Sequence, residues 1–436
     1  MNDRKGIALD GGYGWLIVLA SFVNQALTVG ITYTFGVILV KLLDTFKSEE
    51  STTAWIGSIQ SCLLYLVGII GGPLIRRFGW RVVAISGSIL SAIGFASSGL
   101  VNNLYLLYLT YGIITGIGNG LVYLTSMVCI QHYFDKRRAL ATGIVVSGSG
   151  VGMLLFSVAT PALLKKIEWR ATFFVQAAIM LSGSFFSALY KPIKMQVLSE
   201  RTPLMESSCE ETEKKSKHSS FTIDLSLFQE PIFIIFCISL LSFGFSYHVP
   251  FTYTPDRAIH ISGGEITLSD ASIFVSIMGI SSVIGRLIMG SFSDTIPNIR
   301  FYIFGSVLIL GGILNMSISI FTTYIRIVFY SILFGVFSGF FAALFPVVLV
   351  DLLGVNEIEK SMGQALAVTS FGFLVASPLS GKFNNFFLAD FVILTLFNFR
   401  FNYSAYKQFR HTILGCRRMR IFRRIDLPFN KNYHLV

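Results

Sequence analysis

The sequence predicts an all-α polytopic membrane protein built as two six-helix halves, with a last span that is short or incomplete. The first observation is composition. Of 436 residues, 53% are hydrophobic and only 13% are charged, whereas about 25% of a soluble globular chain is charged. The second is that about a dozen apolar stretches approach the ~20 residues that a helix needs to cross a bilayer. A soluble core cannot bury this much apolar sequence, so we expect the bilayer to solvate it.

Short polar segments separate the apolar stretches. A twelfth stretch, residues 386–399, is only fourteen residues long and contains Asp390, so it can cross only by thinning the bilayer or by snorkelling of its flanks. The eleven stretches that are long enough to cross lie at residues 15–40, 54–75, 82–101, 104–130, 139–164, 171–190, 231–253, 271–292, 301–321, 324–350 and 362–381.

A polar, densely charged segment at residues 191–230 divides the chain, and its composition predicts a disordered cytoplasmic linker. It separates an N-terminal half, residues 1–190 with six helices, from a C-terminal half, residues 231–399 with five or six. A tail at residues 400–436 follows, with nine Lys or Arg against one acid, Asp426. After a membrane body, such a tail predicts attraction to anionic cytoplasmic lipid, and we expect no nucleic-acid partner.

Basic residues orient the predicted bundle, because loops rich in Lys and Arg stay in the cytoplasm. Such residues gather at 76–81 and at 136–138. Both loops should therefore be cytoplasmic, together with the N-terminus, and the C-terminus if residues 386–399 cross. Basic residues at 165–170 fall on the other side and are an exception to this rule. The first ten residues lack an apolar core, so we expect no cleaved signal peptide. As a separate expectation, the protein is a multi-pass protein of the plasma membrane.

The two halves resemble each other weakly. The spans at 104–130 and 324–350 both carry glycines four residues apart, and each leads through a basic or polar loop into a similar small-residue segment, at 138–143 and 360–367. Parallel repeats of six spans are the architecture of major facilitator transporters, which bind their solute between the halves near mid-membrane. The repeat therefore predicts a major facilitator fold.

A single arginine, Arg286, lies inside the apolar stretch 271–292. A charge within a span is expensive and usually marks a solute or ion pathway. A guanidinium pairs bidentately with carboxylate, so Arg286 favours an anionic or zwitterionic solute. The alternative is that Arg286 and Asp294 only brace helices at the cytoplasmic edge. Arg286 lies eight residues before Asp294, which is about 12 Å deeper along a helix. This depth in the membrane favours a solute contact over a brace at the cytoplasmic edge.

A series of motifs along the chain resembles the monocarboxylate transporter family. The first is Asp-Gly-Gly-Tyr-Gly-Trp at residues 10–15, which is similar to the signature before the first span of that family. The resemblance extends over residues 10–381 and is lost after Gly381. The further matching segments lie at residues 71–81, 116–123, 133–143, 148–152, 168–174, 249–251 and 345–354.

The resemblance implies a transporter that moves a small carboxylate or related zwitterion by alternating access, and no enzyme, since none of these motifs is catalytic. It implies no cofactor, and it makes a single-span accessory glycoprotein a candidate partner beside the lipid bilayer. Two alternatives stay open. In the first, the chain is a membrane sensor or partner protein that transports nothing. In the second, it is a transporter made inactive by its atypical C-terminal end.

Proton-coupled lactate carriers of the family use a lysine in span one, and an aspartate and an arginine four residues apart in span eight. By the resemblance, these positions hold Tyr33, Ser282 and Arg286. Only the arginine is present, so we expect transport that is not proton–lactate symport. Tyr33 and Ser282 are expected to line the solute path as neutral groups.

Three further residues are candidates for the solute site. The resemblance points to Arg138 and Thr142 at the start of span five, although Arg138 suits a cytoplasmic-end snorkel or an inter-helix clasp better than a solute contact. His248, near the outer end of span seven, is either a buried structural histidine or a proton sensor. The five cysteines show no paired spacing, so neither disulfides nor a metal site are expected.

Overall fold

The computed structural model describes residues 10–48, 50–191, 226–261, 268–317 and 323–380, and every regular element within them is a helix. The short twelfth stretch, the basic tail and all of the central linker except its two ends lie outside the described residues.

The six spans predicted for the first half all appear as helices, and two of them are broken. The first breaks at Thr34, and the second bends by 45° at Val67. The fourth includes one stretch of π-helix. In chain order the elements are α1 (Tyr13–Tyr33), α2 (Phe35–Phe46), α3 (Glu50–Leu66), α4 (Gly68–Phe78), α5 (Trp80–Leu100), α6 (Leu104–Leu107), η1 (Tyr108–Ile114), α7 (Thr115–Tyr133), α8 (Arg138–Lys166) and α9 (Trp169–Ser187).

The second half supplies a helix for each of the other five predicted spans. Among the described residues of the whole chain, six helices are long and apolar enough to cross a membrane, or seven if the bent α3–α4 pair counts as one span. The elements are η2 (Ser226–Gln229), α11 (Pro231–Ile261), α12 (Leu268–Thr295), η3 (Pro297–Ile299), α13 (Arg300–Met316), α14 (Tyr324–Leu353), η5 (Val355–Glu357) and α15 (Ile358–Ser380).

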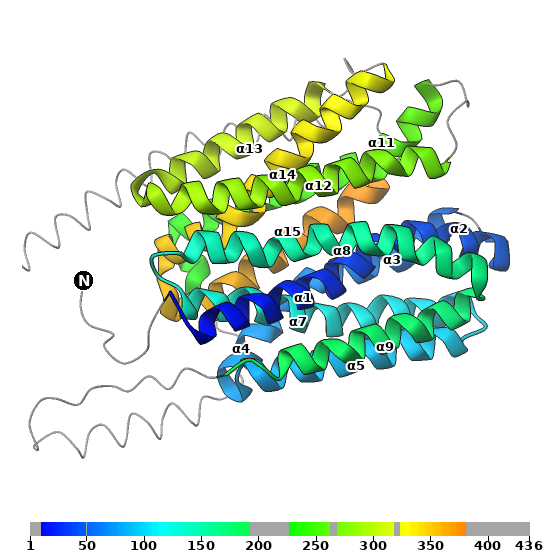
Figure 1. Ribbon diagram of the computed structural model, residues 1–436, viewed down its shortest axis with the longest axis horizontal. Helices are drawn as coiled ribbons and strands as arrows, with labels where there is room; N and C mark the ends of the chain where they lie inside the picture. Colours follow the sequence, from blue (N-terminus) through cyan, green and yellow to red (C-terminus); the bar gives the residue numbers. More distant parts are fainter. Residues whose placement is uncertain (1–9, 49, 192–225, 262–267, 318–322, 381–436) are drawn as a thin grey trace, which may run out of the picture.

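The long helices lie side by side along one axis (Figure 1). The halves meet where α8 packs along α12, and where α15 packs against α3 and α4. Glycines allow the close approach: a Cβ on Gly68 would lie 2.8 Å from the Cα of Gly363, and one on Gly143 would lie 2.6 Å from the carbonyl oxygen of Arg286. Small residues at helix contacts are typical of membrane bundles.

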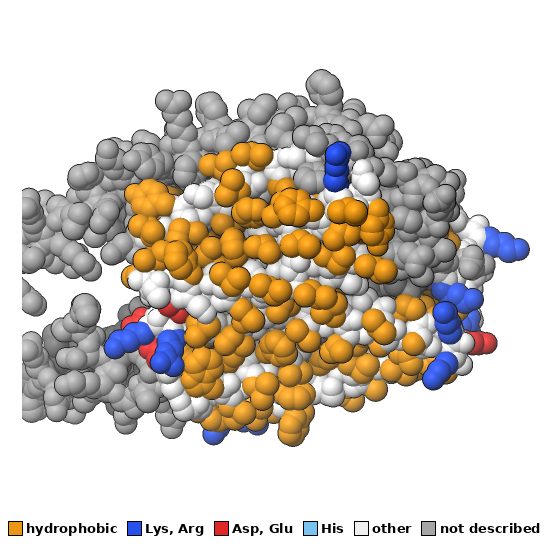
Figure 2. Space-filling view, turned by 45° about the horizontal axis from the view of Figure 1, so that its top comes forward, with side chains coloured by type: hydrophobic (Ala, Val, Ile, Leu, Met, Phe, Trp, Pro, Cys, Tyr) orange, Lys and Arg blue, Asp and Glu red, His pale blue; other side chains and the backbone are white. Residues whose placement is uncertain are grey.

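The outer surface carries a broad band of hydrophobic side chains, and Lys, Arg and acidic residues gather at the two ends of that band (Figure 2). Large apolar side chains are widely exposed on the described helices, among them Ile93, Phe185 and Ile325. Such a surface would aggregate in water, whereas a bilayer would cover it. The protein is therefore a multi-pass membrane protein.

One end of the bundle holds the two halves together, and we call it the clasp end (residues 76–81, 132–140, 294–300 and 351–360). Here the Asp294 carboxylate accepts hydrogen bonds from the backbone N–H groups of Ala139 (3.0 Å) and Leu140 (2.8 Å). These are otherwise unpartnered donors in the first turn of α8, in the opposite half. Arg300 bonds Asp294 at 3.1 Å and Asp351 at 3.2 Å, which fixes both carboxylates.

The opening motif has a structural role at the same end. The Asp10 carboxylate accepts hydrogen bonds of 2.8 to 3.1 Å from the backbone N–H groups of Asp135, Lys136 and Arg137. The Tyr13 hydroxyl donates to the carbonyl of Leu189. The motif therefore ties the start of α1 to the loop between α7 and α8, and to the end of α9.

Candidate solute site between the halves

A cavity of about 70 Å³ lies where the two halves meet, and four helices from each half line it. This volume has room for several water molecules or a small solute. The lining residues are Gln25, Val29 and Tyr33 of α1, Tyr65 of α3, Tyr123 and Met127 of α7, Val146, Ser149, Gly150 and Met153 of α8, Leu240, Phe243 and Tyr247 of α11, Gly279, Ser282 and Arg286 of α12, Phe341, Ala342 and Phe345 of α14, and Leu366, Thr369 and Phe373 of α15.

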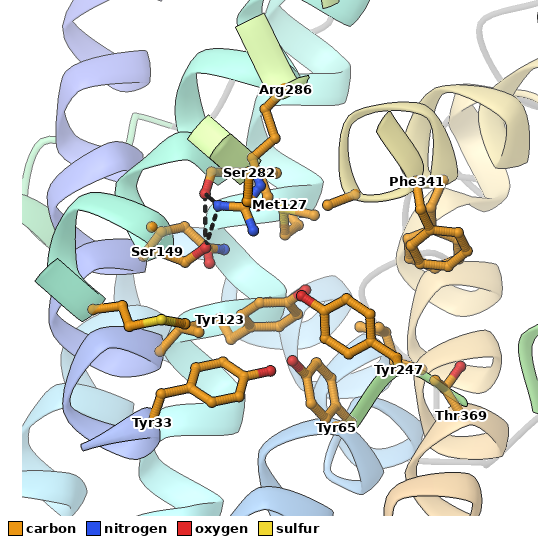
Figure 3. A pocket seen from close by; sticks show the side chains of 18 of the residues that line it. Tyr33, Tyr65, Tyr123, Met127, Ser149, Tyr247, Ser282, Arg286, Phe341 and Thr369 are labelled. Atoms are coloured by element: carbon orange, nitrogen blue, oxygen red, sulfur yellow. Dashed lines mark hydrogen bonds between the residues drawn. The ribbon is translucent and has the colours of Figure 1, made fainter. Parts of the chain in front are cut away.

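Arg286 projects from α12 across the cavity to α8 (Figure 3). It is 5% exposed, and its Nη1 donates to the carbonyl of Val146 and to the hydroxyl of Ser149, both at 2.7 Å. Both acceptors are neutral. The guanidinium is thus held in place, but no acid among the described residues pairs with it.

Three buried polar atoms around the cavity have no hydrogen-bond partner among the described residues. They are Nε of Arg286, Oγ of Ser282 and Oε1 of Gln25. Each such atom costs about 1–3 kcal/mol when left unsatisfied. A carboxylate in the cavity could accept hydrogen bonds from the guanidinium of Arg286 and the hydroxyl of Ser282.

Four tyrosines from both halves surround the space beside the guanidinium: Tyr33, Tyr65, Tyr123 and Tyr247 (Figure 3). The rings of Tyr65 and Tyr123 meet edge-on at 5.2 Å between centroids. Aromatic rings with polar tips give a cavity that is apolar along its walls and polar at a few points, as solute sites commonly are.

The structure brings three of the six predicted site residues into this cavity, namely Tyr33, Ser282 and Arg286. Sequence reasoning missed Gln25 and three of the tyrosines. Each of these residues is polar and lies inside a predicted apolar span, a signal that singles out candidates. It does not tell which face of the helix turns towards the other half.

Arg138 and Thr142 do not line the cavity: Arg138 belongs to the clasp end, and Thr142 lies one helical turn further along α8. Arg138 donates to the Phe134 carbonyl at 3.0 Å and to the Asp135 carboxylate at 3.2 Å, and both of these partners lie just before the start of α8. Thr142 accepts a bond from Gln131.

His248 belongs to α11, but its side chain is not among those described. The described residues contain no cluster of His, Cys, Asp or Glu that could hold a metal ion.

Asp294 does not pair with Arg286. It bonds α8 and Arg300 instead. Asp294 therefore braces the helices through α8 and Arg300, without Arg286. The side chain of Arg286 lines the cavity instead.

The relatives by sequence include several monocarboxylate transporters. A monocarboxylate transporter 12 of Xenopus laevis is 28% identical over 383 residues, covering 85% of this chain and 83% of the relative. Human monocarboxylate transporter 6 is 27% identical, covering 85% and 75%. These relatives are transporters by name.

Among solved structures, the proton:xylose symporter XylE superposes with a TM-score of 0.67 at 15% identity, over 90% of this chain and 95% of the other. The human organic anion transporter MFSD10 superposes with a TM-score of 0.68 at 13% identity, over 90% and 100%. At this identity, the two likenesses establish the fold alone. The family model described as Major Facilitator Superfamily matches residues 19–377, and the chain, whose relatives by sequence include monocarboxylate transporters, therefore belongs to that superfamily.

Proposed function

We propose that the protein is a secondary active or facilitative transporter that moves a small monocarboxylate or related zwitterionic solute across the plasma membrane by alternating access. The observation that carries this proposal is the buried Arg286 guanidinium in the cavity between the halves, with its Nε unpartnered among the described residues. A carboxylate suits this group because the planar fork of arginine matches its two oxygens. Ser282 and Gln25 supply further unpartnered polar atoms beside it.

The clasp end supports the alternating part of the proposal. Its contacts between Asp294 and α8, and between His132 and Glu359 at 3.1 Å, join the two halves. They must break for that side to open. We assign the clasp end to the cytoplasm because its loops hold the basic residues at 76–81 and 136–138.

A panel of labelled probes tests the function. Cells expressing the chain are compared with vector-only cells for uptake of pyruvate, 3-hydroxybutyrate, β-alanine and glycine betaine, with surface abundance measured by biotinylation. We expect uptake of at least one probe above the control, and competition by other small carboxylates. Normal surface abundance with no uptake or efflux of any probe would favour the alternative of a membrane sensor or an inactive form.

A further inference from the structure

The charge balance of the cavity has consequences for the transport cycle. Among the described residues that line it, Arg286 is the single charged group, and the others are apolar, hydroxylated, thioether or amide side chains. The hydrogen-bond partners of Arg286 are neutral groups, namely the Val146 carbonyl, the Ser149 hydroxyl and the Tyr247 hydroxyl. The described part of the empty site therefore keeps one uncompensated positive charge.

Alternating access must at some moment close the cavity on both sides. Closing it around an unpaired cation is costly, because removing a charge from water is unfavourable unless an opposite charge compensates it. A bound monocarboxylate anion compensates the charge, so the loaded site is neutral as a whole. The binding site of the loaded carrier should therefore reorient quickly between the two faces of the membrane, and that of the empty carrier slowly.

We infer that the protein is an exchanger of monocarboxylate anions, in which one anion enters as another leaves and net flux is slow. This inference rests on the proposed function and adds to it the anionic substrate class and the exchange mode. A zwitterion is a poorer substrate in this scheme, because it would leave the loaded site as positive as the empty one.

Ser282 is the position where the charge balance is most easily changed. It lies four residues before Arg286 on α12, so the two side chains share one face of the helix. Both line the cavity, and Ser282 is 3% exposed with a hydroxyl that has no hydrogen-bond partner in the described part of the chain. An aspartate here would place a carboxylate beside the guanidinium, and the empty site would become neutral.

The direction of the voltage effect follows from the same charges. In net uptake the neutral loaded carrier moves inward and the positive empty carrier returns outward. A potential that is negative inside opposes this return, because it acts on the positive charge as that charge crosses the field. Net uptake should therefore be slowed by an inside-negative potential, whereas one-for-one exchange of anions should be insensitive to it.

The test uses the full chain in proteoliposomes of phosphatidylcholine and phosphatidylserine, with labelled pyruvate and 3-hydroxybutyrate outside. Vesicles preloaded with the same unlabelled anion should take up label on the order of tenfold faster than empty vesicles. The reason is that the empty carrier must enclose an unpaired arginine charge before it can return, which is costly. A potassium gradient with valinomycin, negative inside, should slow uptake into the empty vesicles only. Equal rates in loaded and empty vesicles would overturn the inference but leave the proposed transport function intact.

Ser282→Asp and Ser282→Asn form a matched pair for the mechanism, because they differ in charge and hardly in size. The aspartate variant should lower the ratio of exchange to net uptake several-fold, and the asparagine variant should keep it high. A folded aspartate variant with an unchanged ratio would contradict the inference. Where the aspartate variant fails to fold, the loading and voltage measurements on the parental chain decide.

Two further outcomes separate the proposals. Transport of β-alanine without any flux of either anion would overturn the anion exchange while preserving a transporter. Absence of flux for every probe, in both loaded and empty vesicles containing correctly folded protein, would overturn the proposed function itself.

Discussion

At the scale of single residues, Arg286 combines burial with unused bonding capacity. Its Nη1 makes two bonds of 2.7 Å that hold the side chain across the cavity, while its Nε has no partner among the described residues. A purely structural arginine would be expected to satisfy every donor, as Arg300 comes closer to doing with one backbone and two carboxylate partners. Among the described residues, the bonding of Arg286 is therefore less complete than that of Arg300, as the proposed solute role requires.

Replacing Arg286 gives the first prediction. Arg286→Ala should reduce uptake of the transported probe about thirtyfold or more, since losing one member of a buried charged pair costs about 2–5 kcal/mol. Arg286→Lys should also impair uptake strongly, because an ammonium lacks the bidentate fork. Arg326→Ala, at an exposed site on α14, is the matched control. Parental uptake by Arg286→Ala at equal surface abundance would refute the solute role.

The sequence located the charged member of the site but not its surroundings. Arg286 stands out because charge is rare in an apolar span. Tyr65, Tyr123 and Tyr247 do not stand out, since a tyrosine in a span is equally suited to packing and to the membrane interface. Their convergence depends on how helices from different halves are turned against each other, and no local pattern in one span contains that information.

At the scale of elements, α12 is positioned by glycines in its neighbours. A Cβ on Gly339 of α14 would meet the carbonyl oxygen of Ser282 and lie 2.9 Å from the backbone nitrogen of Arg286. Both obstacles are backbone atoms, which cannot rotate away. The close contact of α12 with α14 therefore fixes the height and the direction of the Arg286 side chain.

Gly339→Ala should consequently impair transport and lower the melting temperature of the purified protein, because α12 must shift to accept one methyl group. Overpacking of this kind costs about 1–3 kcal/mol. Gly311→Ala on α13 is the control, since a Cβ there meets nothing within 4 Å, and alanine favours a helix over glycine by about 1 kcal/mol. Thermal unfolding and uptake are measured on both variants. Equal behaviour of the two would contradict the packing argument.

The clasp end supplies another element-level prediction. Asp294→Asn should destabilise the closed clasp, because the amide loses the charge that favours the N-terminus of α8 and one acidic partner of buried Arg300. We expect a lower melting temperature and faster trypsin cleavage at the basic loop 136–138. Asp135→Asn is the matched control: this acid is 67% exposed and pairs with Arg138, and exposed pairs contribute about 0–1 kcal/mol. A larger loss of stability in Asp135→Asn than in Asp294→Asn would refute the conclusion that Asp294 holds the clasp end together.

Element boundaries show what hydropathy can predict. Each of the eleven predicted spans coincides with a helix or a broken helix. The break at Thr34 and the bend at Val67 were not predicted, since apolar residues continue through both. Hydropathy reports the solvent around a helix, whereas a bend depends on backbone features such as Gly68 and Pro73 beside Val67, which a sliding count of apolar residues does not register.

At the scale of the whole molecule, the two-half fold follows from sequence more directly than the site does. A dozen apolar stretches, a polar linker and repeated glycine patterns restrict the architecture to few possibilities. The matching family model and the two superposed transporters agree with that architecture. The orientation of the bundle and the position of the tail remain predictions, because they depend on charges relative to a membrane.

The last prediction concerns that orientation. The tail at residues 400–436 lies outside the described residues, and its sequence carries nine basic residues against one acid, with aromatic residues between them. Each basic residue near an anionic leaflet contributes about 1 kcal/mol, so the tail should lie on the cytoplasmic face, on the same side as the clasp end. This requires residues 386–399 to cross the membrane.

An epitope tag after Val436 tests it in intact and permeabilised cells, with a tag before Met1 as the cytoplasmic reference and a tag inserted after Asn102 as the expected external one. The Val436 tag should be labelled only after permeabilisation, like the Met1 tag. Labelling in intact cells would place the tail outside and rule out the twelfth crossing. The second half would then contain five spans, and an incomplete, inactive bundle would become the better account of this chain.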